Sequence, residues 1–319
     1  MTRFKTKDFD GRSVLVLGAT GFIGRHLVAR LSGAGAQVVA VSRKVDQRTS
    51  QAPNVIWRQC DAANRDQVAG LFRDVRPDVT YQLTSDTRSQ GGRDLALIHD
   101  SIRNDLIAST NVLSEAARLG HGRVVMTGSL EEPEGSARDA VPSSPYAAAK
   151  WASSGYARMI SALHDLPVTV LRLMMVYGPG QKEHKVIPYT IRTLLAGEPA
   201  KLASGHRVLD WVYVDDVVDA FLRAGVAPEA YPQSIDIGAG RAIRLRDLLL
   251  LVGELIGRPE LLAFGDRTDP AMEREATADI TDAFVKLGWR PETSLREGLL
   301  RTIAYHRDAA ATRVAEARS

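Results

Sequence analysis

A tyrosine and a lysine stand four residues apart in the segment SSPYAAAK, at Tyr146 and Lys150. On a helix, residues at i and i+4 share one face, so the two side chains would lie together. A tyrosine with its ordinary pKa of about 10 is a poor acid–base catalyst at neutral pH. We expect the ammonium group of Lys150 to favour the phenolate and to bring the pKa of Tyr146 toward the working range.

One predicted strand earlier, the segment VVMTGSLEE supplies Thr127 and Ser129 at the carboxyl end of that strand. Ligands of open α/β sheets bind at this edge of the sheet. We predict that Ser129 hydrogen-bonds a substrate carbonyl or alcohol beside the tyrosine, although an ordinary turn hydroxyl would give the same pattern. The sequence thus predicts a proton-transfer site made of Ser129, Tyr146 and Lys150.

Three glycines, at positions 18, 21 and 24, lie between an apolar run and an amphipathic segment. Glycine lets the backbone pass close to a pyrophosphate, and a helix N-terminus offers it N–H groups and partial positive charge. A tight strand-to-helix turn without a ligand is the competing interpretation. The strand before and the helix after favour dinucleotide binding. The residues that we assign to the cofactor at this turn are Gly18, Gly21, Phe22, Ile23 and Gly24.

The end of the second predicted strand indicates which dinucleotide binds. Cofactors with a free ribose 2′-hydroxyl usually meet an acidic residue there, but this strand ends in Ser42, Arg43 and Lys44. Two cations and a hydroxyl suit a 2′-phosphate, so we predict NADP(H), with NAD less favoured; a solvated basic loop is the alternative. Asp61, after the third strand, is expected to reach the adenine amino group or to cap a helix at Ala62.

The elements that must position these groups alternate along the chain. Apolar runs predict strands over residues 13–17, 36–41, 54–60, 78–85, 122–128 and 167–174. Amphipathic segments predict helices over residues 21–31, 65–75, 95–119 and 145–163. Strands without alternation, separated by such helices, form a parallel sheet covered on both faces. We therefore predict an α/β fold with a Rossmann-type, doubly wound parallel sheet.

The alternation breaks after about residue 178. We predict a loop over residues 178–188, a helix over 189–199, a strand turning into a helix over 208–225, and a helix over 244–257, followed by two more helices. The predicted organisation is a cofactor-binding domain over residues 1–178 and a smaller C-terminal, substrate-binding lobe over residues 179–319. The second lobe is expected to interleave with the first rather than fold separately.

Composition excludes some classes of function. The formal net charge is only +3, so electrostatics alone gives no reason to expect nucleic acid or a membrane as partner. The single cysteine, Cys60, excludes a disulfide within the chain and favours a reducing compartment. The polar N-terminus and the lack of a long apolar run make a cytoplasmic protein the expectation.

Several longer segments resemble one family. The order GATGFIG, a strand ending in Ser129 and Tyr146-Ala-Ala-Ala-Lys150 resembles the extended short-chain dehydrogenase/reductase superfamily, in its nucleotide-sugar epimerase/dehydratase branch. Further segments are similar to that family's signatures and extend the match over nearly the whole chain: RNDLIASTNVLSEAARLG, VLRLMMVYGPGQ, HRVLDWVYVDDVVDA, IDIGAG and LGWRPETSLREGLLRTI. The resemblance implies a nicotinamide dinucleotide in the first lobe and a nucleoside-diphosphate sugar in the second.

The resemblance also implies roles for single residues. Arg207 and Arg274 look like the family's diphosphate-contacting arginines, a role that suits the arginine fork. Met175 replaces the family's asparagine, and a thioether cannot make the same hydrogen bonds, so the substrate pocket is altered or the substrate is atypical. We also assign Leu83, Thr84 and Asn104 to the cofactor and Thr127 and Glu131 to the substrate. The two long helices imply a homodimer.

The run Ser129-Leu130-Glu131 narrows the set of reactions that the chain could catalyse. The most common dehydratases of the family have Thr-Asp-Glu there, and Leu130 cannot donate a proton. A dehydratase with Thr-Ser-Glu, which uses NADP, remains open, as does a plain loop role for Glu131. The NADP prediction favours NADPH-dependent reduction of a 4-keto-6-deoxy nucleoside-diphosphate sugar. A 4-epimerase or 4,6-dehydratase with retained cofactor, and a non-catalytic NADP-binding regulator, are the alternatives.

Overall fold

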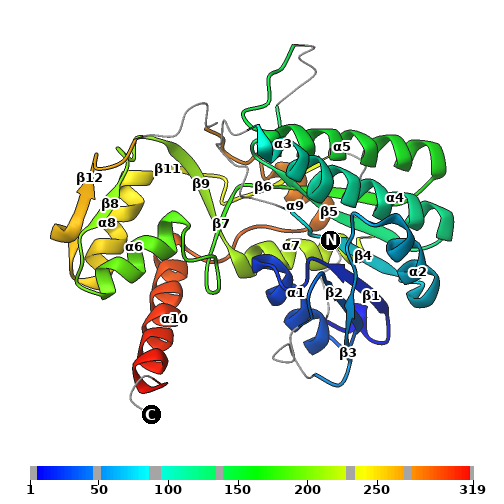
Figure 1. Cartoon of the computed structure of the whole chain (residues 1–319), viewed down its shortest axis with the longest axis horizontal. Coiled ribbons are helices and arrows are strands. Elements are labelled where there is room, and N and C mark those ends of the chain that lie inside the picture. The colour runs from blue at the N-terminus through cyan, green and yellow to red at the C-terminus, as the bar shows by residue number, and fades with distance from the viewer. Residues whose placement is uncertain are drawn as a thin grey trace.

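A seven-stranded, all-parallel sheet forms the centre of the protein. The computed structural model describes residues 6–45, 52–85, 95–133, 139–227, 234–268 and 275–316. The strand order is β10-β6-β5-β4-β1-β2-β3 (Figure 1). Their bounds are β1 Ser13–Leu17, β2 Gln37–Ser42, β3 Val55–Gln59, β4 Val79–Gln82, β5 Arg123–Ser129, β6 Val168–Leu173 and β10 Ser234–Ile237. The order reverses next to β1, as in a doubly wound sheet, so the predicted fold class is confirmed.

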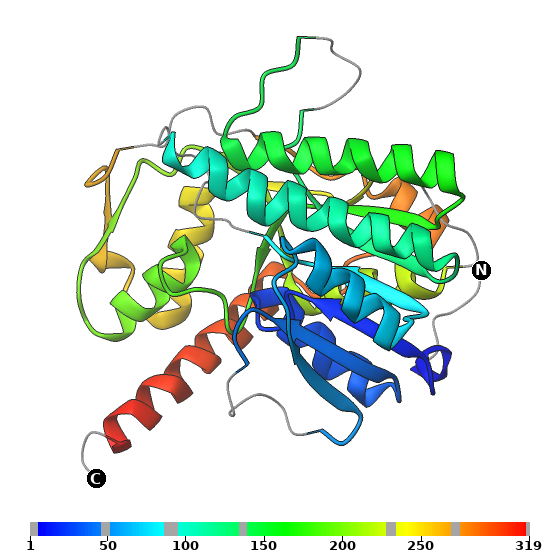
Figure 2. The same ribbon diagram turned by 45° about the vertical axis from the view of Figure 1, so that its right-hand side comes forward.

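Helices cover both faces of this sheet, because each strand sends alternate side chains to opposite sides. On β1, Val14 and Val16 join an apolar cluster with α1 (Phe22–Gly33) and α7 (Val214–Val226). Leu15 and Leu17 join a second cluster on the other face. The helices of that second face are α2 Arg65–Val75, α4 Ala108–Leu119 and α5 Pro145–His164 (Figure 2). The short helix α9 (Thr281–Leu287) packs near α7 and β10.

The predicted helix over 95–119 is continuous in space but not uniform. It consists of α3 (Ala96–Ser101), a π-helical segment η3 (Ile102–Ile107) and α4. The expectation of one regular α-helix is therefore wrong in the middle turn. The segment η3 contains no proline or glycine that would mark the change from α-helix to π-helix. All of its residues are compatible with an ordinary α-helix, so the residue types did not reveal the wider turn. Wide turns of this kind occur frequently at functional sites.

In the described residues, the smaller lobe contains two short sheets and three helices. Their orders are β11-β9-β7 and β12-β8. The strands are β7 Met175–Tyr177, β8 Ala200–Leu202, β9 Val208–Tyr213, β11 Ala242–Arg244 and β12 Leu262–Phe264, and the helices are α6 Val186–Leu195, α8 Leu245–Ile256 and α10 Leu295–Glu316. A short 3₁₀ turn, Pro259–Leu261, follows α8 in this lobe. A second one, Thr6–Phe9, precedes β1 at the other end of the chain. The loop predicted over residues 178–188 ends earlier than expected, because α6 already begins at Val186. The helix tolerates Pro188 because this residue lies in its first turn.

The C-terminal half of the chain also completes the central sheet. Strand β10 pairs in parallel with β6 and forms the edge next to it. Across this pair, Arg172 donates two hydrogen bonds to Asp236, at 2.6 and 2.8 Å. Within the ranges that the structure describes, no helix combines the length and apolar character needed to cross a bilayer.

Candidate active site

The three glycines form a tight turn, and two of them, Gly18 and Gly24, have no room for a side chain. Gly18 has a φ of +83°, and a Cβ on it would lie 2.9 Å from the carbonyl carbon of Leu83. A Cβ on Gly24 would overlap the carbonyl oxygen of Gly18. Gly21 is the N-cap of α1, with no side chain over the helix end. The free helix N-terminus and the bare backbone together fit the pyrophosphate of a dinucleotide.

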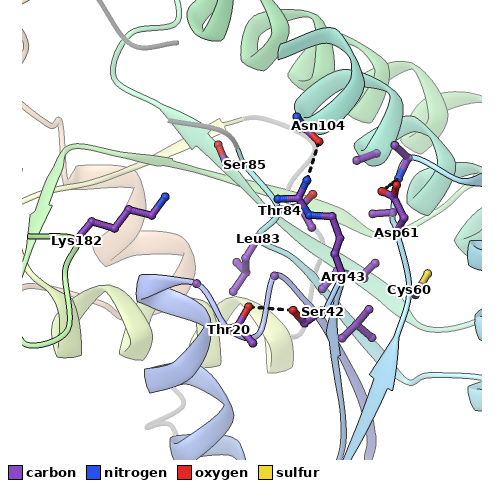
Figure 3. A pocket seen from close by; sticks show the side chains of 17 residues that line it. Thr20, Ser42, Arg43, Cys60, Asp61, Leu83, Thr84, Ser85, Asn104 and Lys182 are labelled. Carbon is purple, nitrogen blue, oxygen red and sulfur yellow. Dashed lines mark hydrogen bonds between the residues drawn. The ribbon is translucent and has the colours of Figure 1, made fainter. Parts of the chain in front are cut away.

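A pocket opens beside this turn, along the carboxyl ends of β1, β2 and β4. It is lined by Ser42, Arg43, Asp61, Leu83, Thr84 and Asn104, and Lys182 enters from the other lobe (Figure 3). The guanidinium of Arg43 donates to Asn104 Oδ1 at 3.4 Å, and the hydroxyls of Thr20 and Ser42 lie 3.1 Å apart. Lys44 is exposed on the following turn, where its backbone N–H donates to Ser42 Oγ at 3.4 Å. The pocket thus gathers predicted cofactor residues from several separate segments, but Lys44 is not among the residues that line it.

Asp61 does not play one of the two roles predicted for it. The expected cap at Ala62 is wrong: α2 begins at Arg65, and the side chain of Asn64 caps it by accepting from Gln67 N–H at 3.1 Å. Asp61 instead forms an ion pair with Arg103 on η3 and accepts from Ala63 N–H at 3.1 Å. Burial opposes ionisation of Asp61, but the hydrogen bonds and the arginine charges outweigh it and lower its pKa.

A second pocket adjoins the first and contains the predicted chemical groups. Its lining includes Phe22, Ile23 and Gly24 from the glycine turn, together with Thr127, Ser129, Tyr146 and Met175. Ser129 ends β5, and Tyr146 lies in the first turn of α5. That helix starts here because Ser144 Oγ accepts from Ala147 N–H at 3.1 Å and Pro145 occupies the first turn. The side chains of Ser129 and Ser85 hydrogen-bond to Tyr146.

Lys150 lies one turn after Tyr146 and is almost completely buried, at 2% exposure. Its ammonium group donates to Thr127 Oγ1 at 3.0 Å and to the Thr127 carbonyl at 3.3 Å. It also lies 3.5 Å from Asp105 Oδ1 and 5.9 Å from the centre of the Tyr146 ring. The structure therefore brings Ser129, Tyr146 and Lys150 together, as the spacing predicts.

The effect of Lys150 on the tyrosine is not the predicted one. The pKa of Tyr146 is raised above its ordinary value, first by burial and then by the negative charge of Asp105. The hydrogen bond from Ser129 opposes this rise but does not reverse it. Sequence reasoning missed Asp105, which no local motif connects to the tyrosine. It also missed Ser85, although its place just after β4 was a usable signal.

Glu131 and Arg207 lie near each other, although neither is among the residues that line the second pocket. Ser144 donates to Glu131 at 3.2 Å, and burial raises the pKa of Glu131 despite this bond and the positive charges of Arg207 and Lys185. Arg207 also faces Glu275. Lys185, which lines the second pocket, was not predicted. Arg274 lies outside the residues that the structure describes.

The chain is similar to known enzymes in sequence and in structure. A sequence model of the NAD dependent epimerase/dehydratase family matches residues 14–238. A UDP-glucose 4-epimerase of Mycolicibacterium smegmatis is 32% identical, over 92% of this chain and 98% of that protein. A dTDP-6-deoxy-L-talose 4-dehydrogenase (NAD(P)(+)) of Kitasatospora kifunensis is 29% identical, over 90% and 93%. The structure of MoeE5 in complex with UDP-glucose and NAD superposes with a TM-score of 0.80 at 29% identity, over 93% and 99%.

Proposed function

Because this chain belongs to the NAD-dependent epimerase/dehydratase family and is an NAD(P)-dependent enzyme of the extended short-chain dehydrogenase/reductase type, we propose that it reduces a 4-keto-6-deoxy nucleoside-diphosphate sugar with NADPH. The observation that carries the proposal is Arg43, whose guanidinium lines the dinucleotide pocket at the end of β2. A cation at that position fits a ribose 2′-phosphate, and NADPH is the usual donor for net reductions. The dehydrogenase from Kitasatospora kifunensis, named for either cofactor, supports the same class of reaction.

The proposed chemistry uses three side chains. When bound, the reduced nicotinamide supplies a hydride to the carbonyl carbon. As the hydride adds, the π electrons of the C=O bond move onto the carbonyl oxygen, which takes the phenolic proton of Tyr146. Ser129 holds that oxygen by a hydrogen bond. Lys150 stabilises the resulting phenolate and, after releasing one of its present contacts, holds the nicotinamide ribose. Solvent then returns a proton to Tyr146.

The test is turnover of a panel of 4-keto sugar nucleotides with added NADPH. We expect stoichiometric oxidation of NADPH and formation of the hydroxy sugar. A 4-epimerase or 4,6-dehydratase remains the second candidate, favoured by the Mycolicibacterium smegmatis relative and by the pKa of Glu131, which burial raises in a way that suits an acid catalyst. It would turn over 4-hydroxy sugar nucleotides with no added cofactor. A non-catalytic NADP-binding regulator would do neither.

Replacing Arg43 with alanine should weaken NADPH binding by about tenfold or more and leave NADH binding nearly unchanged. A charge-assisted hydrogen bond is worth about 1.5–3 kcal/mol, and 1.4 kcal/mol is a factor of ten. Calorimetric titration of both cofactors measures the ratio. Arg30→Ala, in the last turn of α1, is the matched control and should bind both cofactors normally. Equal loss for NADH and NADPH would refute the 2′-phosphate role.

The sugar nucleotide is proposed to lie in the second lobe. Arg207 and Arg274 would contact its diphosphate, and Thr127, Glu131 and Met175 would line the sugar end. A structural role is the alternative for Arg207, because it faces the carboxylates of Glu131 and Glu275. A cytoplasmic location is proposed from the single, buried Cys60, which suits a reducing compartment.

A homodimer is proposed through the two long helices. The outer face of α3, η3 and α5 carries exposed apolar side chains, at Ile98, Ile102, Ile107, Tyr156, Met159 and Leu163. Light scattering at micromolar concentration should give a mass of about twice 34.7 kDa. Met159→Arg should lower that mass, whereas Val285→Arg, at a more exposed apolar position on α9, should not. A monomeric wild-type protein would contradict the proposal.

A further inference from the structure

The two pockets of the candidate active site meet along a shared wall. The residues that line both of them are Gly18, Gly21, Leu83, Ser85 and Lys182. Beyond this shared wall, the first pocket contains Arg43 and the second contains Tyr146. A molecule that reaches from one of these residues to the other must therefore pass along the shared wall.

A nicotinamide dinucleotide has its pyrophosphate in the middle. Its adenosine half fits the first pocket, and its nicotinamide half must reach the second, where Tyr146 is the proposed proton donor. The pyrophosphate therefore belongs at the shared wall, which agrees with the bare backbone at Gly18 and the open end of α1 at Gly21. Of the five residues that form this wall, Lys182 alone carries a formal charge, and its sign is opposite to that of a pyrophosphate.

The segment that carries Lys182 is fixed against the cofactor-binding half of the protein. On α1, His26 Nε2 lies 2.9 Å from the carbonyl oxygen of Pro179. The backbone of Gly180 lies against the guanidinium of Arg25, since a Cβ on Gly180 would be 3.1 Å from Arg25 Nη1. These contacts place the backbone just before Lys182, and Figure 3 shows the lysine side chain extending from the other lobe toward the first pocket.

The charge of Lys182 has no carboxylate partner in the part of the chain that the structure describes. The side chain is exposed, and the carboxylate of the next residue, Glu183, pairs with Arg192 at 2.6 Å. Burial is the largest cause of the lowered pKa values of His184 and Lys185, and the charge of Lys182 lowers both further. Three basic side chains thus crowd this segment, and an anion beside Lys182 would relieve their repulsion.

We propose that Lys182 binds the pyrophosphate of the dinucleotide from the smaller lobe, by a charge-assisted hydrogen bond to a phosphate oxygen. The glycine turn contacts the same group through the backbone of the other lobe, so the cofactor is held between the two lobes. Lys185 lines only the second of the two pockets and faces Glu131, so it is left for the sugar end. The proposal requires a bound dinucleotide, but neither a preference for NADPH nor a reduction.

Titration calorimetry with three ligands tests this position of Lys182. NADH, NADPH and ADP-ribose all contain the pyrophosphate, and ADP-ribose lacks the nicotinamide. Lys182→Ala should bind each of the three about tenfold more weakly, because a charge-assisted hydrogen bond is lost. The ratio of NADPH affinity to NADH affinity should not change, which separates this effect from that of Arg43→Ala. Lys182→Arg keeps the cation and should recover most of the lost affinity.

Lys201 on β8 supplies the matched control. It is exposed in the same lobe and lines neither pocket. Lys201→Ala removes the same charge, so it measures the effect of net charge alone, and it should bind all three ligands like wild type. Because Lys182 is also exposed, Lys182→Ala should unfold at the same temperature as wild type in the absence of ligand.

Three results would overturn the proposal. The first is a Lys182→Ala variant that binds all three ligands like wild type. The second is weaker binding of NADH and NADPH with unchanged binding of ADP-ribose, which would assign Lys182 to the nicotinamide half. The third is unchanged binding of the dinucleotides with weaker binding of UDP, a probe for the sugar-nucleotide side. A wild-type protein that binds NADPH but reduces no 4-keto sugar nucleotide would instead refute the proposed function and leave this inference intact.

Discussion

Replacing Tyr146 with phenylalanine should lower turnover by about 10²- to 10⁴-fold, the usual range for loss of a general acid. The substitution removes one oxygen from a residue that is 6% exposed, and the ring that packs beside Lys150 remains. Binding of NADPH and of the sugar nucleotide should persist, because neither contact requires the phenolic proton. Steady-state kinetics, with calorimetric titration of NADPH, separates the two effects.

The same helix offers a matched control for this variant. Tyr156 lies three turns from Tyr146 on α5 and is 44% exposed. Tyr156→Phe makes the same chemical change away from the pocket, so its kinetics should match wild type. Near-normal turnover in Tyr146→Phe would exclude Tyr146 as the proton donor.

The second large effect is expected at Gly24. A Cβ there would overlap the Gly18 carbonyl oxygen and lie 2.9 Å from Ala19 Cα, so backbone rather than a flexible side chain must move. Gly24→Ala should cost about 1–3 kcal/mol of unfolding free energy, as overpacking does. Because the turn that moves is the one that would hold the pyrophosphate, NADPH should also bind at least about tenfold more weakly. Chemical denaturation and calorimetric titration measure the two losses.

Gly33, at the other end of α1, provides the control. A Cβ on Gly33 meets nothing within 4 Å, and the residue is exposed. Gly33→Ala should leave NADPH affinity unchanged and stability equal or slightly higher, since alanine favours helix. If Gly24→Ala bound NADPH as tightly as wild type, the glycine turn would not be the cofactor's phosphate site.

Features that depend on short stretches of sequence were predictable. The glycine turn, the strands around it and the Tyr146–Lys150 pair all rest on local spacing, and the structure reproduces their arrangement. Ser129 was found because it ends a predicted strand of a parallel sheet, and ligands bind at the carboxyl edge of such sheets. Local periodicity and the rule for parallel sheets were sufficient for these features.

Features that depend on contacts between distant residues were not predictable. Asp105 lies 45 positions before Lys150, and nothing in its surroundings in sequence marks it as buried. The π-helical turn that places it has the composition of an ordinary helix. The pKa of Tyr146 was predicted in the wrong direction because its burial, the largest cause of the rise, and the charge of Asp105, the next cause, depend on the fold and not on the motif.

The late arrival of β10 has a consequence for the synthesis of this protein. Translation produces β6 more than 60 residues before Ser234–Ile237, the strand that covers its edge. During that interval the nascent chain presents a row of unpaired backbone groups, with Arg172 awaiting Asp236. Open strand edges recruit strands from other chains. Between the synthesis of residues 173 and 234, neighbouring nascent chains on one messenger RNA can therefore pair through this edge, and a chaperone bound to it would prevent such pairing.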